Sequence, residues 1–337
     1  MKETLKISVY ITSYNQKGYL CEAIESVLNQ TLRPFEIIII DDFSHDGSQN
    51  IIASYALKNP DLIRPIYNDR NLGISQTRNK ALSAVRGDYV TYLDGDDKFL
   101  PRKLETESRC IALNPDTHIV FSNFYSIDES GEKLWVWIED QMPPQGNIFV
   151  QTFAKDFPKK IHFRNELVSY EAIKNVDFYD TNLTIYEDYD IRIRLTKKYR
   201  AVFNNEPCAE YRRHSAGLSI SQNIYQHIRD LEYLYTKNLP LLNDLNSKKK
   251  KYVRKEINEN IARIIRGHSM FLIGNNYPHI DNRIKAFKLY LKSFKYSKSK
   301  IDAKSLAKLL LHQKIYWWFE KNYMKLKKIT KKQSAKN

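Results

Sequence analysis

The chain has 337 residues and a formal net charge of +15 at pH 7, from 54 Lys and Arg against 39 Asp and Glu. Apolar residues make up 42% and aromatic residues 12%, which excludes a mainly disordered chain. No apolar run approaches the roughly 18 residues of a membrane-spanning helix, and the N-terminus shows no signal-peptide pattern. The three widely spaced cysteines favour a reducing cytoplasm. The positive charge leaves three kinds of partner open: nucleic acid, an anionic membrane or a phosphorylated ligand.

The first two thirds of the chain alternates apolar runs with amphipathic stretches of helical period. The pattern predicts strands at 7–11, 35–40, 62–67 and 89–93, and helices at 18–30, 46–58, 74–86 and from Pro101 onward. Alternation of this kind predicts an α/β fold with a mostly parallel sheet, flanked by helices and joined by right-handed crossovers. In such sheets ligands bind beyond the carboxyl ends of the strands.

Three carboxylates follow the fourth predicted strand, in Asp94-Gly95-Asp96-Asp97. Their mutual repulsion disfavours burial unless a cation compensates, and Mg²⁺ takes one or two carboxylates together with water and substrate phosphate. A solvated acidic turn is the simpler alternative. Because Asp41-Asp42 end the neighbouring strand, we favour a metal–diphosphate site. No glycine-rich or Walker-type phosphate loop is present, which counts against a dehydrogenase or a kinase.

Further candidate residues lie elsewhere in the chain. Glu187-Asp188 open an amphipathic segment, either as acidic residues favoured in a first helical turn or as a general base for a sugar hydroxyl. His214 lies in a basic loop and is either exposed or a ligand of metal or phosphate. Arg78 is either a surface helix residue or a partner of a diphosphate or a base.

Taken together, these motifs resemble the family 2 glycosyltransferases of the GT-A fold, over roughly residues 6–220. The resemblance rests on many ordered segments: 11–15, 23–31, 36–42, Ser44, Asp46-Gly47, 71–73, 77–79, 93–97, 187–188 and 211–215.

The resemblance implies an inverting transfer of a sugar from a nucleotide diphosphate, usually a UDP-sugar, with Mn²⁺ or Mg²⁺ as cofactor. The acceptor would be a saccharide or lipid-linked molecule in cell-surface glycan synthesis. The resemblance implies that the uridine is framed by Thr12, Tyr14, Asp42 and Arg78, and that Asp94 supports the loop beside the nucleotide sugar. It implies that Asp96 contacts the ribose or the metal, that Asp97 binds the metal, and that His214 contacts the metal or the diphosphate. Asp188 would be the general base, with Glu187 beside it. The Gln-x-x-Arg-Trp pattern and membrane helices of processive synthases are missing, which argues against a polymer synthase.

Residues 128–168 match no pattern that we can assign, although they include Trp135 and Trp137. By position this stretch would overlie the acceptor side, where aromatic faces stack on sugars. The alternative is a loop packed by its own aromatic side chains.

The charge is concentrated at the C-terminal end. Residues 1–221 carry 27 Lys and Arg against 31 Asp and Glu, a net of −4, whereas residues 222–337 carry 27 against 8, a net of +19. We therefore predict a catalytic domain over 1–221 and a basic helical region over 222–337. Within 303–337 an apolar stripe through Leu311, Ile315 and Trp318 is surrounded by lysines, as in helices that lie in an anionic membrane interface. Packing on the catalytic domain and contact within a homo-oligomer are the alternatives.

The leading hypothesis is thus a cytoplasmic glycosyltransferase, peripheral at the inner face of the cell membrane. A nucleic-acid-binding protein is the rival from another class, but the acidic first two thirds of the chain do not fit it; we expect no nucleic-acid partner. A catalytically inactive sugar-binding homologue is the third reading, and the presence of Asp97 and Asp188 argues against it.

Overall fold

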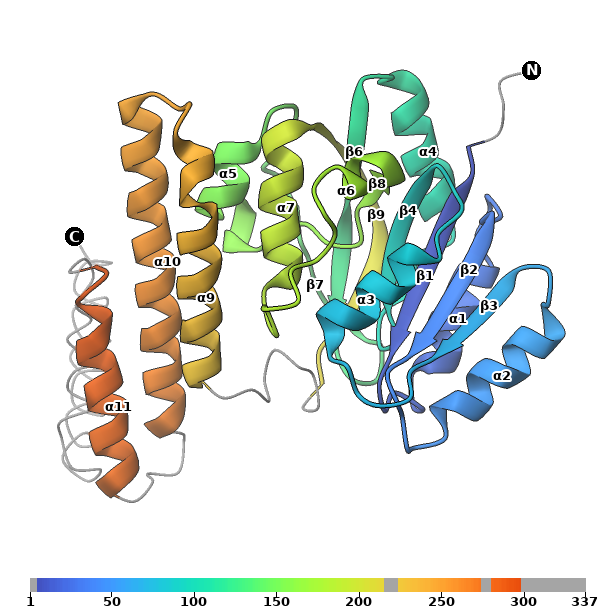
Figure 1. The fold of residues 1–337 in the computed structure, drawn as a ribbon, viewed down its shortest axis with the longest axis horizontal. Helices are drawn as coiled ribbons and strands as arrows, with labels where there is room; N and C mark the ends of the chain where they lie inside the picture. Colours follow the sequence, from blue (N-terminus) through green and yellow to red (C-terminus); the bar gives the residue numbers. More distant parts are fainter. Residues whose placement is uncertain (1–4, 215–223, 274–279, 298–337) are drawn as a thin grey trace, which may run out of the picture. The chain divides into compact units, whose positions relative to one another are not determined.

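The computed structural model describes residues 5–214, 224–273 and 280–297 (Figure 1). The chain divides into two compact units, Met1–Val253 and Arg254–Asn337. This division falls inside a helix, whereas the charge changes at residue 221. The functional boundary between 1–221 and 222–337 stays a prediction.

The first unit is built around a nine-stranded sheet of order β3-β2-β1-β4-β8-β6-β9-β5, with β7 paired to β6. The strands are β1 (Ile7–Ser13), β2 (Glu36–Asp41), β3 (Ile63–Tyr67), β4 (Tyr89–Asp94), β5 (Lys98–Phe99), β6 (Thr117–Ile127), β7 (Lys133–Val136), β8 (Leu167–Ser169) and β9 (Arg200–Arg212). The helices of this unit, with the one that leaves it, are α1 (Leu20–Leu28), α2 (Ser48–Lys58), α3 (Ile74–Ser83), α4 (Lys103–Leu113), α5 (Phe149–Ala154), α6 (Tyr170–Lys174), α7 (Glu187–Lys198), α9 (Ile224–Asn238) and α10 (Ser247–Ile273), with short 3₁₀ turns at Pro158–Lys160 and Leu239–Leu242.

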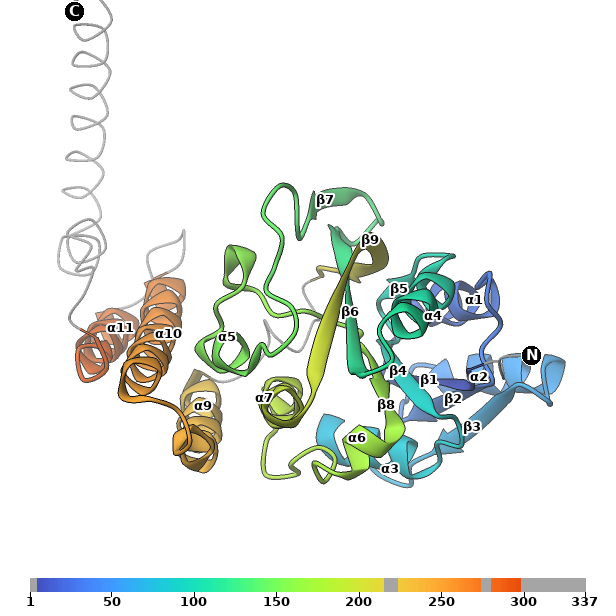
Figure 2. The same ribbon diagram turned by 90° about the horizontal axis from the view of Figure 1, so that it is seen from above.

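The first half of the sheet is parallel, as the sequence predicts. β1 pairs with β2 and β4, and β2 with β3, all in parallel register. Every residue of β1 and β2 is buried, because helices cover both faces: α1 and α4 lie on one side and α3 on the other (Figure 2). The predicted strands and first three helices are confirmed. The fourth helix begins at Lys103, two residues after Pro101, which lies in the preceding turn.

The second half of the sheet is mixed. β8 pairs antiparallel with both β4 and β6, and β5 pairs antiparallel with β9. The long strands β6 and β9 run parallel, from Thr117 opposite Arg200 to Ile127 opposite Arg212. This pairing carries the end of β9 to the loop that follows β4. The α/β fold flanked by helices is therefore confirmed, and its parallel pattern holds in the first half of the sheet.

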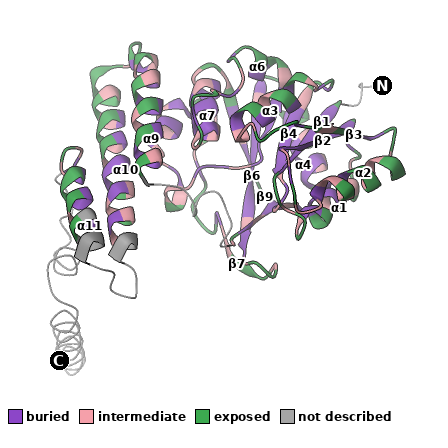
Figure 3. Ribbon diagram, turned by 60° about the horizontal axis from the view of Figure 1, so that its bottom comes forward, coloured by how far each residue is buried: buried purple, intermediate pink, exposed green. Residues whose placement is uncertain are grey.

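The core of the first unit lies along both faces of this sheet, where Figure 3 shows the buried residues gathered on the strands and on the helix sides that face them. α7 packs against α5 and α9. Its buried Ile191 and Leu195 face the sheet core, and its first turn carries three acidic residues. The core thus fixes the helix whose N-terminal end enters the site.

The second unit contains the later turns of α10 and helix α11 (Ile280–Ser293). Buried Ala286 and Tyr290 pack with Met270, Phe287 and Phe294. In the described part of the chain no helix is both long and apolar enough to cross a membrane. The predicted membrane-interface stripe at 303–337 lies outside the described residues.

Candidate functional site

The site is assembled at the carboxyl ends of β1, β2 and β4. Thr12 and Asp94 are register partners, and the Thr12 hydroxyl donates to Asp94 Oδ1 at 2.9 Å. The backbone N–H of Gly95 donates to the Thr12 carbonyl at 2.9 Å. A Cβ at Gly95 would come within 2.5 Å of Gln16 Oε1 and 2.9 Å of the Thr12 carbonyl. Glycine is therefore required for the loop to turn tightly against β1 and present Asp96 and Asp97.

Asp96 and Asp97 are held in place by the end of β9. Asp96 Oδ2 lies 2.9 Å from His214 Nε2, and the backbone N–H of Arg212 donates to Asp97 Oδ1 at 2.8 Å. Burial, followed by the charge of Asp94, raises the pKa of Asp96. Burial and the charges of Asp96 and Asp94 raise the pKa of Asp97 well above its usual value. At both carboxylates, the nearby positive charge is thus too weak to offset burial and the neighbouring negative charges.

The electrostatics of this loop fit a divalent cation. Asp97 has one oxygen outside the hydrogen bond to Arg212, and Mg²⁺ needs only one or two protein carboxylates when substrate phosphate and water complete its shell. No group of three or more His, Cys, Asp or Glu is arranged to hold a metal by itself within residues 5–214, 224–273 and 280–297. The residues fit a metal that arrives with a diphosphate rather than a closed protein cage.

The residues predicted beside the nucleotide differ in how exposed they are. Tyr14, in the loop after β1, has 46% of its surface exposed and is free to contact a base. Asp42 is buried and accepts hydrogen bonds from the backbone N–H groups of Leu72 and Gly73, at 2.8 and 2.9 Å, and from the Asn68 side chain at 2.8 Å. Asp42 therefore fixes the loop that leads into α3 and to Arg78.

Arg78 joins the two acidic parts of the site. Its guanidinium donates to Asp94 at 2.7 Å and to Glu187 at 2.9 Å. The same group lies over the ring of Tyr92 at 4.6 Å and that of Tyr179 at 5.5 Å. Arg78 is 4% exposed, so it is not a surface helix residue. It ties the β4 loop to the start of α7.

Asp188 and Glu187 begin α7 but face different partners. The side chain of Asp188 is 33% exposed and accepts from Arg192 at 2.6 Å through Oδ2, whereas that of Glu187 is 9% exposed and turned to Arg78. Burial, reinforced by the charge of Asp188 and opposed by Arg78, raises the pKa of Glu187 to about 7. Burial would raise the pKa of Asp188 too, but Arg192, Arg78 and Arg164 outweigh it and hold that pKa well below its usual range. Asp188 is therefore ionised throughout the physiological pH range.

Arg192 and Glu166 are site residues that the sequence interpretation missed. Buried Arg192 donates to Glu166 at 2.8 and 3.1 Å, to the Tyr92 hydroxyl at 2.7 Å and to Asp188. The four-residue spacing between Asp188 and Arg192 is the only signal in the sequence, because such pairs lie on one helix face. Glu166 carries no comparable signal, since it is brought in by β8 from another part of the chain.

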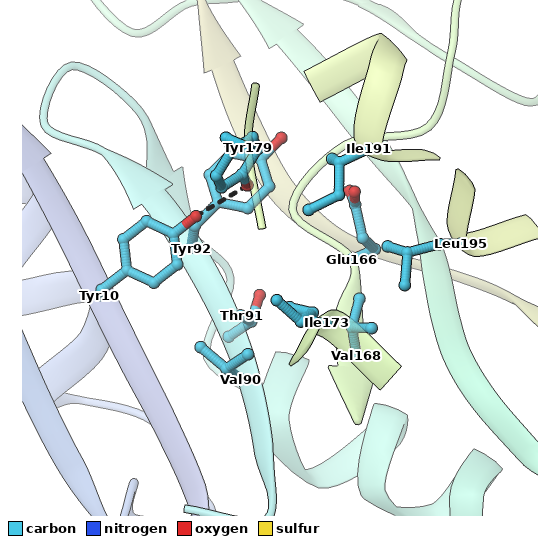
Figure 4. A pocket seen from close by; sticks show the side chains of 10 residues that line it. All are labelled: Tyr10, Val90, Thr91, Tyr92, Glu166, Val168, Ile173, Tyr179, Ile191 and Leu195. Atoms are coloured by element: carbon cyan, nitrogen blue, oxygen red, sulfur yellow. Dashed lines mark hydrogen bonds between the residues drawn. The ribbon is translucent and has the colours of Figure 1, made fainter. Parts of the chain in front are cut away.

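A small cavity lies beneath this layer of charged groups (Figure 4). Its lining includes Tyr10, Tyr92, Tyr179 and Glu166, with apolar side chains from β4, α6 and α7. The hydroxyls of Tyr10 and Tyr179 are 2.9 Å apart and hydrogen-bonded (Figure 4). None of the predicted site residues lines it. The cavity is thus lined by residues that contact Arg78 and Arg192, and not by the predicted site residues.

The two tryptophans of the stretch 128–168 differ in burial, and its place on the acceptor side stays a prediction. Trp137 is fully buried, with its ring 6.2 Å from that of Phe157 in the same stretch and 5.3 Å from that of Phe124 on β6. Trp135, on β7, is only half-buried.

A carboxylate-rich loop after β4, facing a helix that begins with a second carboxylate pair, defines a transferase of the GT-A fold. The sequence model described as "Glycosyl transferase family 2" matches residues 8–216. The chain belongs to this family, and it is a glycosyltransferase.

Individual relatives agree. The chain is 33% identical over 209 residues to the uncharacterized glycosyltransferase MJ1057 of Methanocaldococcus jannaschii, covering 61% of this chain and 70% of that protein. It resembles residues 1–349 of S. aureus TarS, solved with UDP-GlcNAc, with a TM-score of 0.63 and 17% identity over 86% of this chain and 81% of that one. It spans half the length of a longer TarS chain. The mannosyltransferase PcManGT from Pyrobaculum calidifontis, in complex with GDP-Man and Mn²⁺, matches with a TM-score of 0.55 and 13% identity, over 92% of this chain and 86% of that one. At these identities the solved structures show the shared fold.

Proposed function

We propose that the protein transfers a sugar from a UDP-sugar to a saccharide or lipid-linked acceptor in cell-surface glycan synthesis, with inversion at the anomeric carbon and with Asp188 as general base. The observation that carries this proposal is the bridge through Arg78, which joins Asp94 to Glu187 and sets the acidic loop beside the start of α7. The UDP-GlcNAc complex of TarS supports a UDP-sugar as donor.

Asp97 and Asp96, with His214 beside them, are the residues that would hold Mn²⁺ or Mg²⁺. When bound, the cation supplies Lewis-acid stabilisation of the negative charge on the departing diphosphate. The Mn²⁺ in the PcManGT complex supports a metal of this kind. The raised pKa values of Asp96 and Asp97 explain why a cation would bind here, since an added positive charge stabilises both ionised carboxylates.

The chain's own residues then orient the reaction. Tyr14 offers an exposed ring to the uracil base of the donor. Thr12 and Arg78 bind Asp94, so that the loop after β4 keeps its shape. As the acceptor oxygen bonds to the anomeric carbon, the bond from that carbon to the diphosphate breaks and its electron pair leaves with UDP. The hydroxyl proton passes to Asp188, whose Oδ1 is not engaged by Arg192. One displacement of this kind inverts the configuration.

Asp188 suits the role of base better than Glu187. Glu187 is more deeply buried and its carboxylate oxygen accepts a hydrogen bond from Arg78, so it helps to hold Arg78 in place. The low pKa of Asp188 keeps it ionised but makes it a weak base, so proton transfer to it becomes favourable only as the attacking hydroxyl turns acidic in the transition state.

The test is a donor panel. The purified protein with Mn²⁺ is incubated with each common UDP-sugar, and released UDP is measured with and without EDTA. We expect one donor to be turned over and EDTA to stop the release. Absence of UDP release from every donor, or equal release with EDTA, would contradict the proposal. Membrane association through 303–337 and self-association remain separate proposals, to be tested on the full chain.

A further inference from the structure

Two arginines near the site, Arg164 and Arg213, are held over aromatic rings. Arg164 lies between the 3₁₀ turn at Pro158–Lys160 and β8, and Arg213 directly follows β9. Within the described residues neither side chain forms an ion pair or a hydrogen bond. The Arg164 guanidinium instead lies over the Tyr211 ring at 3.6 Å, and that of Arg213 over the Trp135 ring at 5.7 Å. By contrast, Arg78, Arg192, Arg194 and Arg212 are all paired with carboxylates.

The two aromatic rings belong to one row of the sheet. Ser126 of β6 is the register partner of Tyr211 on β9 and of Trp135 on β7. Directly paired residues point to the same face of a sheet, so Tyr211 and Trp135 flank the small side chain of Ser126 on one face. Two strand spacings separate them, about 10 Å. Both rings are half-buried, and each keeps part of its surface exposed.

The row starts beside the proposed base. Arg212, the neighbour of Tyr211, donates its backbone N–H to Asp97 Oδ1 at 2.8 Å. Arg192, which binds Asp188, lies over the ring of Phe163, the residue before Arg164, at 5.2 Å. The charge of Arg164 also acts on Asp188 and Asp97. Tyr211 lies directly under Arg164, and Trp135 lies two strands further away with Arg213 and Lys159 over its ring. A substrate whose hydroxyl reaches Asp188 would extend along this row.

We propose that Arg164, Tyr211, Trp135 and Arg213 form the acceptor subsite, and that this subsite takes an acidic saccharide carrying a carboxylate or a phosphate. The aromatic faces offer apolar surface to the sugar rings. An arginine fork donates two parallel hydrogen bonds to a carboxylate or phosphate. Charge complementarity selects the acidic class, since Arg213 is exposed and neither guanidinium has a hydrogen bond or ion pair within the described residues. The inference rests on the proposed function and narrows its acceptor.

Binding of matched saccharide probes tests this subsite on the full-length protein. One pair is trigalacturonate and its neutral methyl ester, and the other is maltotriose with and without a 6-phosphate group. Dissociation constants are measured by calorimetry for the wild type, Arg164→Gln, Arg213→Gln and the matched control Arg33→Gln. Arg33 is an exposed residue before the start of β2, so its replacement removes the same charge far from the row.

We expect the wild type and R33Q to prefer at least one acidic probe over its neutral partner by about tenfold, and R164Q and R213Q to lose that preference. UDP affinity, measured without added metal, should be unchanged in all variants. Equal binding of the acidic and neutral probes of both pairs by the wild type would overturn the proposal, as would an unchanged preference in R164Q and R213Q. Weaker UDP binding in R164Q with an intact probe preference would assign Arg164 to the donor diphosphate and overturn its acceptor role.

The donor panel separates this outcome from failure of the proposed function. A protein that prefers acidic probes but releases no UDP from any donor would keep the subsite and lose the reaction. A protein that turns over a UDP-sugar but shows no acidic preference would keep the reaction and lose the subsite. Thermal melting of each variant establishes that it is folded.

Discussion

Asp96 and Asp97 in the loop after β4 differ from Asp188 at the start of α7 in how their negative charges are compensated. Asp96 and Asp97 are buried among other carboxylates, and the pKa of each is raised. Asp188 is surrounded by Arg192, Arg78 and Arg164, which outweigh the effect of burial and lower its pKa. His214 lowers the pKa of Asp96 and Arg164 that of Asp97, but burial and the neighbouring carboxylates outweigh both. The arginines of the protein thus offset burial at Asp188 and do not offset it at Asp96 and Asp97.

This difference explains how carboxylates in one site take separate roles. A carboxylate short of positive charge gains by binding a cation, and one already balanced by arginines stays ionised with an oxygen free for a proton. Arg78 pairs with Asp94 in the loop and with Glu187 at the start of α7, so it sets the spacing of the two segments. Each of the two groups can be altered separately, by substitution or by removal of the metal.

Asp188→Asn gives the largest expected effect. Loss of the general base should lower the transfer rate about a thousandfold, while UDP affinity stays within about twofold because the β4 loop is untouched. Single-turnover kinetics and UDP calorimetry measure the two quantities. Near-wild-type turnover in D188N would remove Asp188 from the mechanism.

Chelation acts on the other side of the comparison. EDTA should reduce transfer to background, and Mn²⁺ or Mg²⁺ should restore it, because the cationic groups of the protein do not offset the burial of Asp96 and Asp97. Released UDP measures both steps. Full activity in EDTA after prior dialysis would show that the raised pKa values of this loop serve another purpose.

Removal of Arg192 tests the balance around Asp188. The double variant Arg192→Met with Glu166→Gln avoids leaving a buried carboxylate unpaired. Since Arg192 holds the pKa of Asp188 down, its loss should raise that pKa, so the base becomes protonated at higher pH. The acidic limb of the rate profile should then move to higher pH.

Two controls accompany this variant. Arg192→Lys keeps the charge and should keep the wild-type acidic limb, although with a lower rate, and Glu166→Gln alone should leave the limb in place. A limb that stays at its wild-type pH in the double variant would mean that Arg192 does not set the protonation of Asp188.

Gly95→Ala makes a smaller change on the metal side. The added Cβ would approach Gln16 Oε1 and the Thr12 carbonyl too closely, so the loop must shift. We expect UDP–Mn²⁺ to bind about tenfold more weakly, with the acidic limb of the rate profile unchanged. Unaltered binding would show that the loop tolerates displacement.

Deletion of 303–337 should have the smallest effect on the reaction. We expect weaker binding to anionic vesicles and unchanged transfer to a water-soluble acceptor, measured by co-sedimentation and UDP release. Unchanged vesicle binding would contradict the membrane prediction for this basic segment.

The sequence predicts the parallel half of the fold because each of its strands is a short apolar run followed by a helix. It does not predict the mixed half, since the pairing of β6 with β9 joins residues about eighty positions apart and leaves no local pattern. The same limit applies to the site. Asp94, Asp97 and Asp188 stand out as motifs, whereas the roles of Arg164 and Glu166 depend on neighbours that only the folded chain supplies.

Binding of Mn²⁺ in the presence of UDP tests the central claim most directly. Electron paramagnetic resonance of bound Mn²⁺ is compared for the wild type, Asp97→Asn and Asp188→Asn. We predict that D97N loses the bound ion and that D188N retains it with wild-type affinity. Loss of Mn²⁺ in D188N, or its retention in D97N, would contradict the division of the site into a metal-dependent loop and an arginine-balanced base.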